Sequence, residues 1–391
     1  MKSPSPDKIR NVALIAHGSA GKTTLAEAIL HQGGALSRMG RVDDGSAALD
    51  FTDVEKRRKI SVNLGVGYCE WGGVKINVLD CPGYADFYGD VKAGLRVADA
   101  AIVLVAAPSS VEVGTELVWQ FLDALELPRV LCVNKMDKEH ADFDKCVSDV
   151  HEIFGVRLAP VAIPVGAADS FQGIVDLIEE KAYTYDGSGK AQAGEIPAEM
   201  ADRVAELRTK LIEAAAESNE ALMEKFFSEE TLTPDEIREG LRAGVAAATI
   251  VPVVATAAES AAGVDALMRL IKDIVPSPAA TEKVVGTKPG SEDEEVERAA
   301  TPDAPFAALV FKTVAEQHVG ELSLFRVYAG SVKSGDDVLN AQESAGERMG
   351  TVYGLVGRER KEAESVGAGD IGAVVKLKNT STNDTLCAKS A

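Results

Sequence analysis

The sequence has no apolar run that approaches the length a membrane-spanning helix requires. Its first ten residues carry charges and prolines but no apolar segment of signal-peptide length. We therefore expect a cytoplasmic protein without a membrane partner. Hydrophobic residues make up 46% of the 391-residue chain and charged residues 26%, a balance typical of soluble globular proteins with two or three domains.

Cysteine is scarce and shows no paired spacing. The cysteines are odd in number, and none belongs to a Cys-x-x-Cys pair. They are Cys69, Cys81, Cys132, Cys146 and Cys387. This pattern is typical of free thiols in a reducing compartment and provides no zinc site.

Positive charge is also in short supply. The chain has 41 Lys and Arg against 61 Asp and Glu, which gives a formal net charge of −20. Such a protein does not attract nucleic acid over its whole surface, so we expect no DNA partner. An RNA partner would have to be bound by a local surface patch, by neighbouring proteins or by further domains.

A phosphate-binding pattern lies near the N-terminus. The apolar residues 12–16 have the length of a buried strand, and the apolar residues after the loop continue as a helix. The loop between them consists of His17, Gly18, Ser19, Ala20, Gly21, Lys22, Thr23 and Thr24. Its glycines let backbone N–H groups surround an anion, while the lysine offers a charge and the first threonine offers a hydroxyl to Mg²⁺. Ala16 replaces the first glycine of the motif, and an ordinary glycine-rich turn is the alternative.

A second motif follows the predicted strand 74–79. It consists of Asp80, Cys81, Pro82, Gly83 and Tyr84. A carboxylate at a strand end can hold Mg²⁺ directly or through water, and the N–H of Gly83 can sense a γ-phosphate. The alternative is an ordinary strand-to-turn connection.

A third motif follows the predicted strand 129–133. It consists of Asn134, Lys135, Met136 and Asp137. An Asp here can accept hydrogen bonds from N1–H and the exocyclic amine of guanine, and a site built to pair such groups rejects ligands without them by about 10⁴-fold. Lys135 would pack along the base and Asn134 would brace the loops. The three motifs in this order, each at a strand end, disfavour the ordinary-turn alternatives and predict selection of GTP over ATP.

The order of the predicted elements indicates a doubly wound parallel sheet, because strands alternate with helices and the motifs lie at strand ends. A mostly helical stretch interrupts it, and short alternating strands at the end of the chain predict an antiparallel β-barrel. We expect a first domain at residues 1–160 and 250–278, with an insertion at residues 161–249. An acidic linker at residues 279–305 and a barrel at residues 306–391 would follow.

Three local predictions are specific enough to test. The sequence pattern predicts one long helix at residues 197–227 and one strand at residues 347–355. The charged residues 50–61 have little apolar periodicity, and we expect them to form a mobile surface segment.

The motifs resemble those of the translational GTPases, and specifically of elongation factor G. Phrases at residues 163–174, 181–185, 275–278 and 325–330 extend the resemblance over essentially the whole chain. It implies an α/β P-loop GTPase domain with a doubly wound, mostly parallel sheet and an inserted, mostly helical subdomain, followed by an antiparallel β-barrel. It also implies GTP and GDP binding with Mg²⁺, and a monomer that acts on ribosomal RNA and proteins. The family's later domains are missing, so we expect a shortened form of a longer protein; a naturally short protein is the alternative.

The resemblance assigns roles to individual residues. Residues 17–24 and 80–84 would surround the phosphates, and residues 134–137 would hold the guanine. The loop that closes over the edge of the base would be Thr256, Ala257 and Ala258. The Mg²⁺ ligands would be Thr23, Ser61 and Asp80, and the first switch would run from Asp43 to Ser61. The catalytic residues would be Tyr84, Gly83 and Lys22.

The chain departs from the family pattern at four places. The family usually has Asp at Ser19, Gly at Lys59, Ser at Ala257 and a catalytic His at Tyr84. The last departure matters most, because phenols have a reference pKa near 10 and do not readily take up a further proton or a positive charge at neutral pH. We expect slower hydrolysis than in a relative with the His. The alternative is a neutral replacement, and the chain resembles a branch of elongation factor G-like paralogues with this tyrosine.

Two classes of function remain open. The first is a ribosome-associated enzyme that hydrolyses GTP. The second is a switch that docks on the ribosome with bound GTP, has little or no turnover and has no translocation activity. Measured turnover separates the two.

Overall fold

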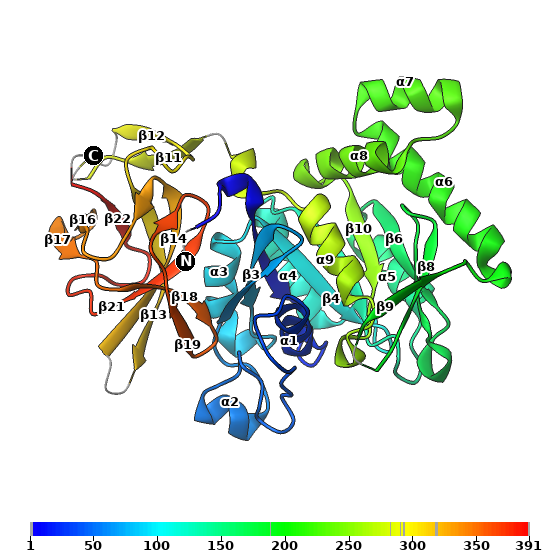
Figure 1. Ribbon diagram of the computed structural model, residues 1–391, viewed down its shortest axis with the longest axis horizontal. Coiled ribbons are helices and arrows are strands. Elements are labelled where there is room, and N and C mark those ends of the chain that lie inside the picture. The colour runs from blue at the N-terminus through cyan, green and yellow to red at the C-terminus, as the bar shows by residue number, and fades with distance from the viewer. Residues whose placement is uncertain are drawn as a thin grey trace.

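The computed structural model describes residues 3–187, 189–281, 283–289, 291, 294–316 and 320–389. Figure 1 shows a helix-flanked sheet at the centre and an antiparallel barrel of strands at the left. This architecture confirms the predicted α/β domain followed by a β-barrel. Among the described residues, no helix combines the length and the apolar character needed to cross a bilayer.

The larger sheet is parallel in its middle and antiparallel at both edges. The strand order is β2-β3-β1-β4-β5-β10-β6-β7-β8-β9, and all pairs from β3 to β6 are parallel. The strands are β1 (Ile9–Ile15), β2 (Gly65–Trp71), β3 (Val74–Asp80), β4 (Ala100–Ala106), β5 (Arg129–Asn134), β6 (Leu158–Val165), β7 (Gly173–Asp176), β8 (Lys181–Tyr185), β9 (Ala191–Gly194) and β10 (Val251–Ala255). The central strands are buried on both faces, which explains their continuous apolar sequences.

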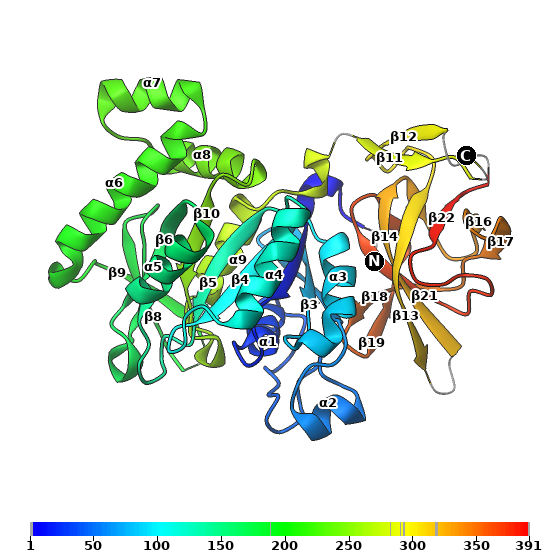
Figure 2. The ribbon, with the colours of Figure 1, turned by 180° about the vertical axis from the view of Figure 1, so that it is seen from behind.

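Helices cover both faces of this sheet. The helices are α1 (Lys22–Gln32), α2 (Asp53–Arg58), α3 (Tyr88–Arg96), α4 (Val113–Ala124), α5 (Phe143–Phe154), α6 (Ala201–Glu217), α7 (Glu220–Glu229), α8 (Pro234–Ala246) and α9 (Val264–Asp273). Helices α1 and α9 lie on the face seen in Figure 1, whereas α3, α4 and α5 lie on the face seen in Figure 2. Helices α6, α7 and α8 project beyond the sheet.

The long helix predicted for residues 197–227 is wrong, because the structure has two helices there, α6 and α7. The break comes at Asn219, whose side-chain oxygen accepts a hydrogen bond from the N–H of Ala221 and caps α7. The insertion also contributes β7, β8 and β9 to the sheet edge. The proposed boundary between residues 160 and 161 falls inside β6, and the division into four parts stays a proposal.

The barrel is antiparallel throughout. Its main sheet runs in the order β17-β16-β22-β13-β14-β21-β18-β19, and β15 pairs with β20 beside it. The strands are β13 (Ala307–Glu316), β14 (Gly320–Ala329), β15 (Ser331–Val332), β16 (Asp337–Asn340), β17 (Ala345–Arg348), β18 (Val352–Val356), β19 (Glu359–Glu362), β20 (Val366–Gly367), β21 (Ile371–Val375) and β22 (Thr385–Ala388). The single strand predicted for residues 347–355 is wrong, because β17 and β18 are separate strands.

The stretch expected to be an acidic linker contains a hairpin of β11 (Lys283–Thr287) and β12 (Glu295–Ala299). Glu292 and Asp293, in the middle of the predicted acidic run, lie outside the described residues.

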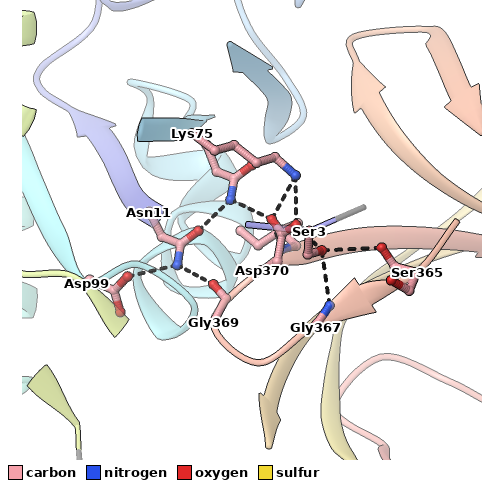
Figure 3. A network of polar contacts seen from close by, with 10 residues as sticks. Ser3, Asn11, Lys75, Asp99, Ser365, Gly367, Gly369 and Asp370 are labelled. Carbon is pink, nitrogen blue, oxygen red and sulfur yellow. Dashed lines mark hydrogen bonds and ion pairs between the residues drawn. The ribbon is translucent and has the colours of Figure 1, made fainter. Parts of the chain in front are cut away.

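A buried polar network joins the barrel to the α/β domain, as Figure 3 shows. The Asp370 carboxylate of the barrel accepts hydrogen bonds from Lys75 Nζ at 2.8 Å, Asn77 Nδ2 at 3.1 Å and Ser3 Oγ at 2.6 Å. The Lys75 and Asp370 side chains are only 5% and 2% exposed. Because solvent is excluded, each charge depends on the other for compensation. This network fixes the barrel against β3.

We expect Asp370→Asn to destabilise the protein by about 3–5 kcal/mol, because the variant leaves the Lys75 charge buried without a full partner. The measurement is urea unfolding followed by fluorescence. Glu206→Gln is the control, because it removes a solvent-exposed pair with Lys210 on α6 and should leave the unfolding midpoint unchanged. Equal, small effects of both substitutions would contradict this description of the interface.

Candidate functional site

Loops that follow β1, β3, β5 and β10 meet at one edge of the larger sheet and enclose a pocket. They converge because the carboxyl ends of parallel strands share an edge. The predicted site residues that line this pocket are Gly18, Ser19, Gly21, Lys22, Thr23, Thr24, Ser61, Gly83, Tyr84, Asn134, Lys135, Asp137 and Ala258.

The loop before α1 has the backbone of a tight anion-binding turn. Gly21 has a φ of 98°, a conformation that glycine adopts at little cost, and a Cβ there would lie 2.5 Å from Asn134 Nδ2. Ser19 has a φ of 64°, which Asp and Asn tolerate better than Ser. Helix α1 begins directly at Lys22, so the N–H groups of its first turn are available to an anion.

Lys22 is a buried cation that contacts no carboxylate directly among the residues that the structure describes. Its side chain is 6% exposed, and Nζ donates to the carbonyl oxygens of His17 at 3.0 Å and Ala16 at 3.4 Å. Burial lowers the pKa of Lys22, and the nearby Asp80 opposes this shift. A phosphate in the pocket would supply the negative charge that this ammonium group lacks.

Beside Lys22, two hydroxyls and two carboxylates form a cluster of Thr23, Asp50, Ser61 and Asp80, which we call the oxygen cluster. Thr23 Oγ1 donates to Asp80 Oδ2 at 2.7 Å and lies 2.9 Å from Ser61 Oγ. Ser61 Oγ in turn donates to Asp50 Oδ2 at 3.1 Å. Burial, followed by the charge of Asp50, raises the pKa of Asp80 to about 8, and burial raises the pKa of Asp50 to about 6.

The oxygen cluster fits a divalent cation. Asp80 Oδ1 is buried and has no hydrogen-bond partner among the described residues. Neighbouring ligands of an octahedral Mg²⁺ with bonds of about 2.0–2.1 Å lie about 2.9 Å apart, which is the separation of the Thr23 and Ser61 oxygens. In the part of the chain that the structure describes, no group of three or more His, Cys, Asp or Glu could hold a metal. Additional oxygen ligands would therefore come from water or from a phosphate.

Residues 40–64 contain the predicted first switch, and we call them the switch segment. The buried Glu27 of α1 holds its first half: its carboxylate accepts hydrogen bonds from the N–H groups of Gly40 at 2.9 Å, Ala48 at 2.7 Å and Leu49 at 3.3 Å. Burial raises the pKa of Glu27 while these bonds oppose the shift. One carboxylate of α1 therefore binds three backbone N–H groups in the first half of the switch segment.

A second buried glutamate organises the other half of the switch segment. Glu55 accepts hydrogen bonds from the N–H groups of Thr52, Val62 and Asn63, and Thr52 and Glu55 form the capping box that begins α2. The prediction of a mobile surface segment at residues 50–61 did not anticipate this helix or the burial of Asp50 and Glu55. The reason is that Glu55 binds backbone N–H groups and Asp50 binds the Ser61 hydroxyl. Neither kind of contact produces an apolar periodicity in the sequence.

At the opposite end of the pocket, Asn134 ties three loops together. Its Nδ2 donates to the Ala20 carbonyl at 3.0 Å, and its Oδ1 accepts from Thr256 Oγ1 at 3.1 Å and from the N–H of Ala258 at 3.0 Å. The phosphate loop is thereby held at a fixed distance from the loop after β10. Lys135 and Asp137 line the pocket beside this junction.

A chain of surface ion pairs crosses the same end of the pocket. Lys138 pairs with Asp137 at 3.0 Å and with Glu259 at 2.8 Å, and Glu259 also pairs with Arg41 of the switch segment at 2.5 Å. These side chains are 28–56% exposed, so each pair adds little to stability. Their position connects the switch segment to the loop after β10.

Tyr84 lies directly over the phosphate loop. A Cβ on Gly18 would lie 2.9 Å from Tyr84 Cζ, and a Cβ on Gly83 would lie 2.8 Å from Gly18 Cα and 2.5 Å from Lys22 Nζ. A side chain at position 18 would collide with the Tyr84 ring, and one at position 83 would collide with the backbone of Gly18. Both positions therefore need glycine. Tyr84 is 39% exposed, and its ring forms part of the pocket wall.

Several predicted residues support the pocket without lining it. His17 turns away, because its Nδ1 accepts from the N–H of Gly114 at the start of α4. Met136 and Thr256 are fully buried behind the end of the pocket that Asn134 braces. The complete set outside the lining is His17, Ala20, Asp80, Cys81, Pro82, Met136, Thr256 and Ala257.

The pocket also has lining residues that the motifs did not indicate. Most come from the switch segment, for which the resemblance implied only a switch between residues 43 and 61. They are Met39, Gly40, Arg41, Val42, Asp43, Asp50, Lys59, Ile60, Lys138 and Glu259.

Comparison with known proteins agrees with this geometry. Residues 7–277 match the family model of the elongation factor Tu GTP-binding domain, and residues 305–389 match that of elongation factor G domain 2. A crystal structure of a protein from Thermus thermophilus is similar, with a TM-score of 0.87 and 32% sequence identity. The similarity covers 97% of this chain and 54% of that one, so this chain spans about half the length of that solved relative. The protein therefore belongs to the translational GTPases that carry the elongation factor Tu GTP-binding domain, and its second domain makes it one of the elongation factor G type.

Proposed function

We propose that the pocket binds GTP and GDP with Mg²⁺, and that the protein hydrolyses GTP as a translation factor. The observation that carries this proposal is the arrangement of a buried lysine, the oxygen cluster and the braced Asn134–Asp137 loop around one pocket. Lys22 and the N–H groups of α1 would hold the β- and γ-phosphates. Asp137 would accept two hydrogen bonds from guanine, and Ala258 would lie at the edge of the base.

Mg²⁺ would be held by the hydroxyls of Thr23 and Ser61 and by Asp80, and would neutralise charge on the phosphates when bound. Asp50 would orient Ser61, because it accepts the hydrogen bond of that hydroxyl. The N–H of Gly83 would contact the γ-phosphate from its place beside Lys22 and Gly18. Catalysis in this chemistry depends on positioning and charge stabilisation, which these groups supply.

Tyr84 stands where the family has its catalytic histidine, and we propose that it makes hydrolysis slow. Its phenol can hydrogen-bond a water molecule but does not readily take up a further proton at neutral pH. Its ring also packs over Gly18 of the phosphate loop, and we propose that this contact limits the movement of the phenol toward a water at the γ-phosphate.

The packing of Tyr84 also favours a second candidate function, a GTP-dependent switch with little or no turnover. In both functions the protein acts in the cytoplasm as a monomer that docks on ribosomal RNA and proteins, as expected for its family. A net charge of −20 requires that this contact use local surfaces rather than overall attraction.

Asp137→Asn tests the choice of guanine. Each hydrogen bond to a charged acceptor contributes about 1.5–3 kcal/mol, so we expect GDP affinity to fall about a hundredfold or more. The measurement is titration with a fluorescent GDP analogue, with ATP as competitor. Asp169→Asn, an exposed residue outside the pocket, is the control and should bind GDP like the parent. If Asp137→Asn also bound GDP like the parent, the guanine site would lie elsewhere.

Tyr84→His tests the role of the tyrosine. We expect single-turnover GTP hydrolysis to rise about tenfold or more, with the larger gain when ribosomes are present, because an imidazole can carry the proton. GDP affinity should stay unchanged and serves as the control for folding. A Tyr84→His variant that is no faster than the parent would refute the proposed cause of slow hydrolysis.

A further inference from the structure

We propose that the barrel is part of the nucleotide switch, because it holds the switch segment in the arrangement that brings Ser61 to Thr23. The inference rests on the proposed function, since it concerns how the same pocket distinguishes GTP from GDP. Two contacts carry it, one at the end of the switch segment and one at its middle.

The first contact runs through Asp90 of α3. Asp90 Oδ2 accepts a hydrogen bond from the N–H of Leu64 at 2.7 Å and one from Lys312 Nζ of the barrel at 2.6 Å. The Lys312 side chain is 10% exposed and that of Asp90 is 27% exposed. Lys312 therefore neutralises and orients the carboxylate that holds the switch segment three residues after Ser61.

Packing reinforces this contact. A Cβ on Gly94 of α3 would lie 3.1 Å from Leu64 Cδ1 and 2.9 Å from Cys81 Sγ. Leu64 is therefore held by its N–H on Asp90 and by its side chain on α3, next to the Asp80 motif. A shift of α3 would therefore move Ser61 through Leu64 and Asp80 through Cys81.

The second contact is made by Gly357, in the turn between β18 and β19. Its N–H donates to the Val66 carbonyl at 2.9 Å, and a Cβ on Gly357 would lie 1.9 Å from the carbonyl oxygen of Ala48. Ala48 is the residue whose N–H is bonded to Glu27. The switch segment is therefore enclosed between Glu27 of α1 on one side and the barrel turn on the other.

A further contact between the barrel and the α/β domain involves residues outside the switch segment. Arg326 of β14 pairs with Asp99 at 2.5 Å and donates to the Val97 carbonyl at 3.0 Å. Arg326 is as deeply buried as Lys312, so it offers a matched comparison. If the barrel acts through the switch segment, loss of the Lys312–Asp90 pair must change the preference between GTP and GDP, whereas loss of the Arg326–Asp99 pair must not.

The experiment measures the affinities of a non-hydrolysable GTP analogue and of GDP, with Mg²⁺, for the parent, Lys312→Met and Arg326→Met. We expect Lys312→Met to lower the preference for the GTP analogue relative to GDP about fivefold or more. Arg326→Met should keep the parent's preference within about twofold, even if its thermal stability falls. Lys312→Arg, which retains the charge, should restore most of the preference.

Substitutions at two glycines give an independent test that does not depend on a buried charge. Gly357→Ala places a methyl group against Ala48, whereas Gly335→Ala places one in open space of another barrel turn, 3.9 Å from Arg348. Both positions have positive φ, 57° and 89°, and the value at Gly335 lies further from the left-handed region that alanine can occupy. Backbone strain alone would therefore not make Gly357→Ala the more harmful substitution. We expect only Gly357→Ala to lower the preference for the GTP analogue.

Each outcome bears on a different statement. If the parent binds neither nucleotide, the proposed function fails and the inference fails with it. If the parent binds both nucleotides and Lys312→Met and Gly357→Ala keep its preference, the proposed function stands and the inference is overturned. Equal losses in Lys312→Met and Arg326→Met would also overturn it, because general loosening of the interface would then explain the effect.

Discussion

The structure depends on one electrostatic constraint, the burial of two carboxylates next to each other in the oxygen cluster. Asp50 and Asp80 are 4% and 1% exposed, and burial raises the pKa of both carboxyl groups, while the charge of Asp50 raises that of Asp80 further. The hydroxyls of Thr23 and Ser61 bridge them. The two carboxylates favour a bound cation, and the ammonium group of Lys22 beside them favours a bound anion. Mg²⁺ and a nucleotide would meet both requirements together.

The fold brings these groups together from distant parts of the chain. Thr23 comes from the first turn of α1, Asp80 from the end of β3, and Ser61 from the switch segment. The first two are placed by parallel strands that end at one edge of the sheet. Ser61 has no such support, and its position depends on Glu27, Glu55 and Asp90, which bind backbone N–H groups of the switch segment. The barrel completes this support through Lys312 and Gly357.

The sequence predicted the strands and motifs of the site because their residue types have direct structural causes. The apolar runs of β4, β5 and β10 and the glycines around Lys22 are recognisable without a structure. It did not predict the carboxylate anchors, because a Glu such as Glu27 or Glu55 in a charged stretch resembles a solvated surface residue. It likewise predicted one helix through Asn219 and one strand through residues 347–355, since neither break alters the local hydrophobic pattern. The hairpin β11–β12 carries only weakly buried residues and so gave no signal.

The central claim is that the pocket binds guanine nucleotide and Mg²⁺ together. Calorimetric titration of the purified protein with GDP, a non-hydrolysable GTP analogue and ATP, each with Mg²⁺ and with EDTA, tests it most directly. We predict one site that binds both guanine nucleotides, binds the GTP analogue more tightly with Mg²⁺ than with EDTA, and does not bind ATP at comparable concentrations. Binding of ATP with the affinity of GDP, or binding of the GTP analogue that Mg²⁺ does not strengthen, would contradict it.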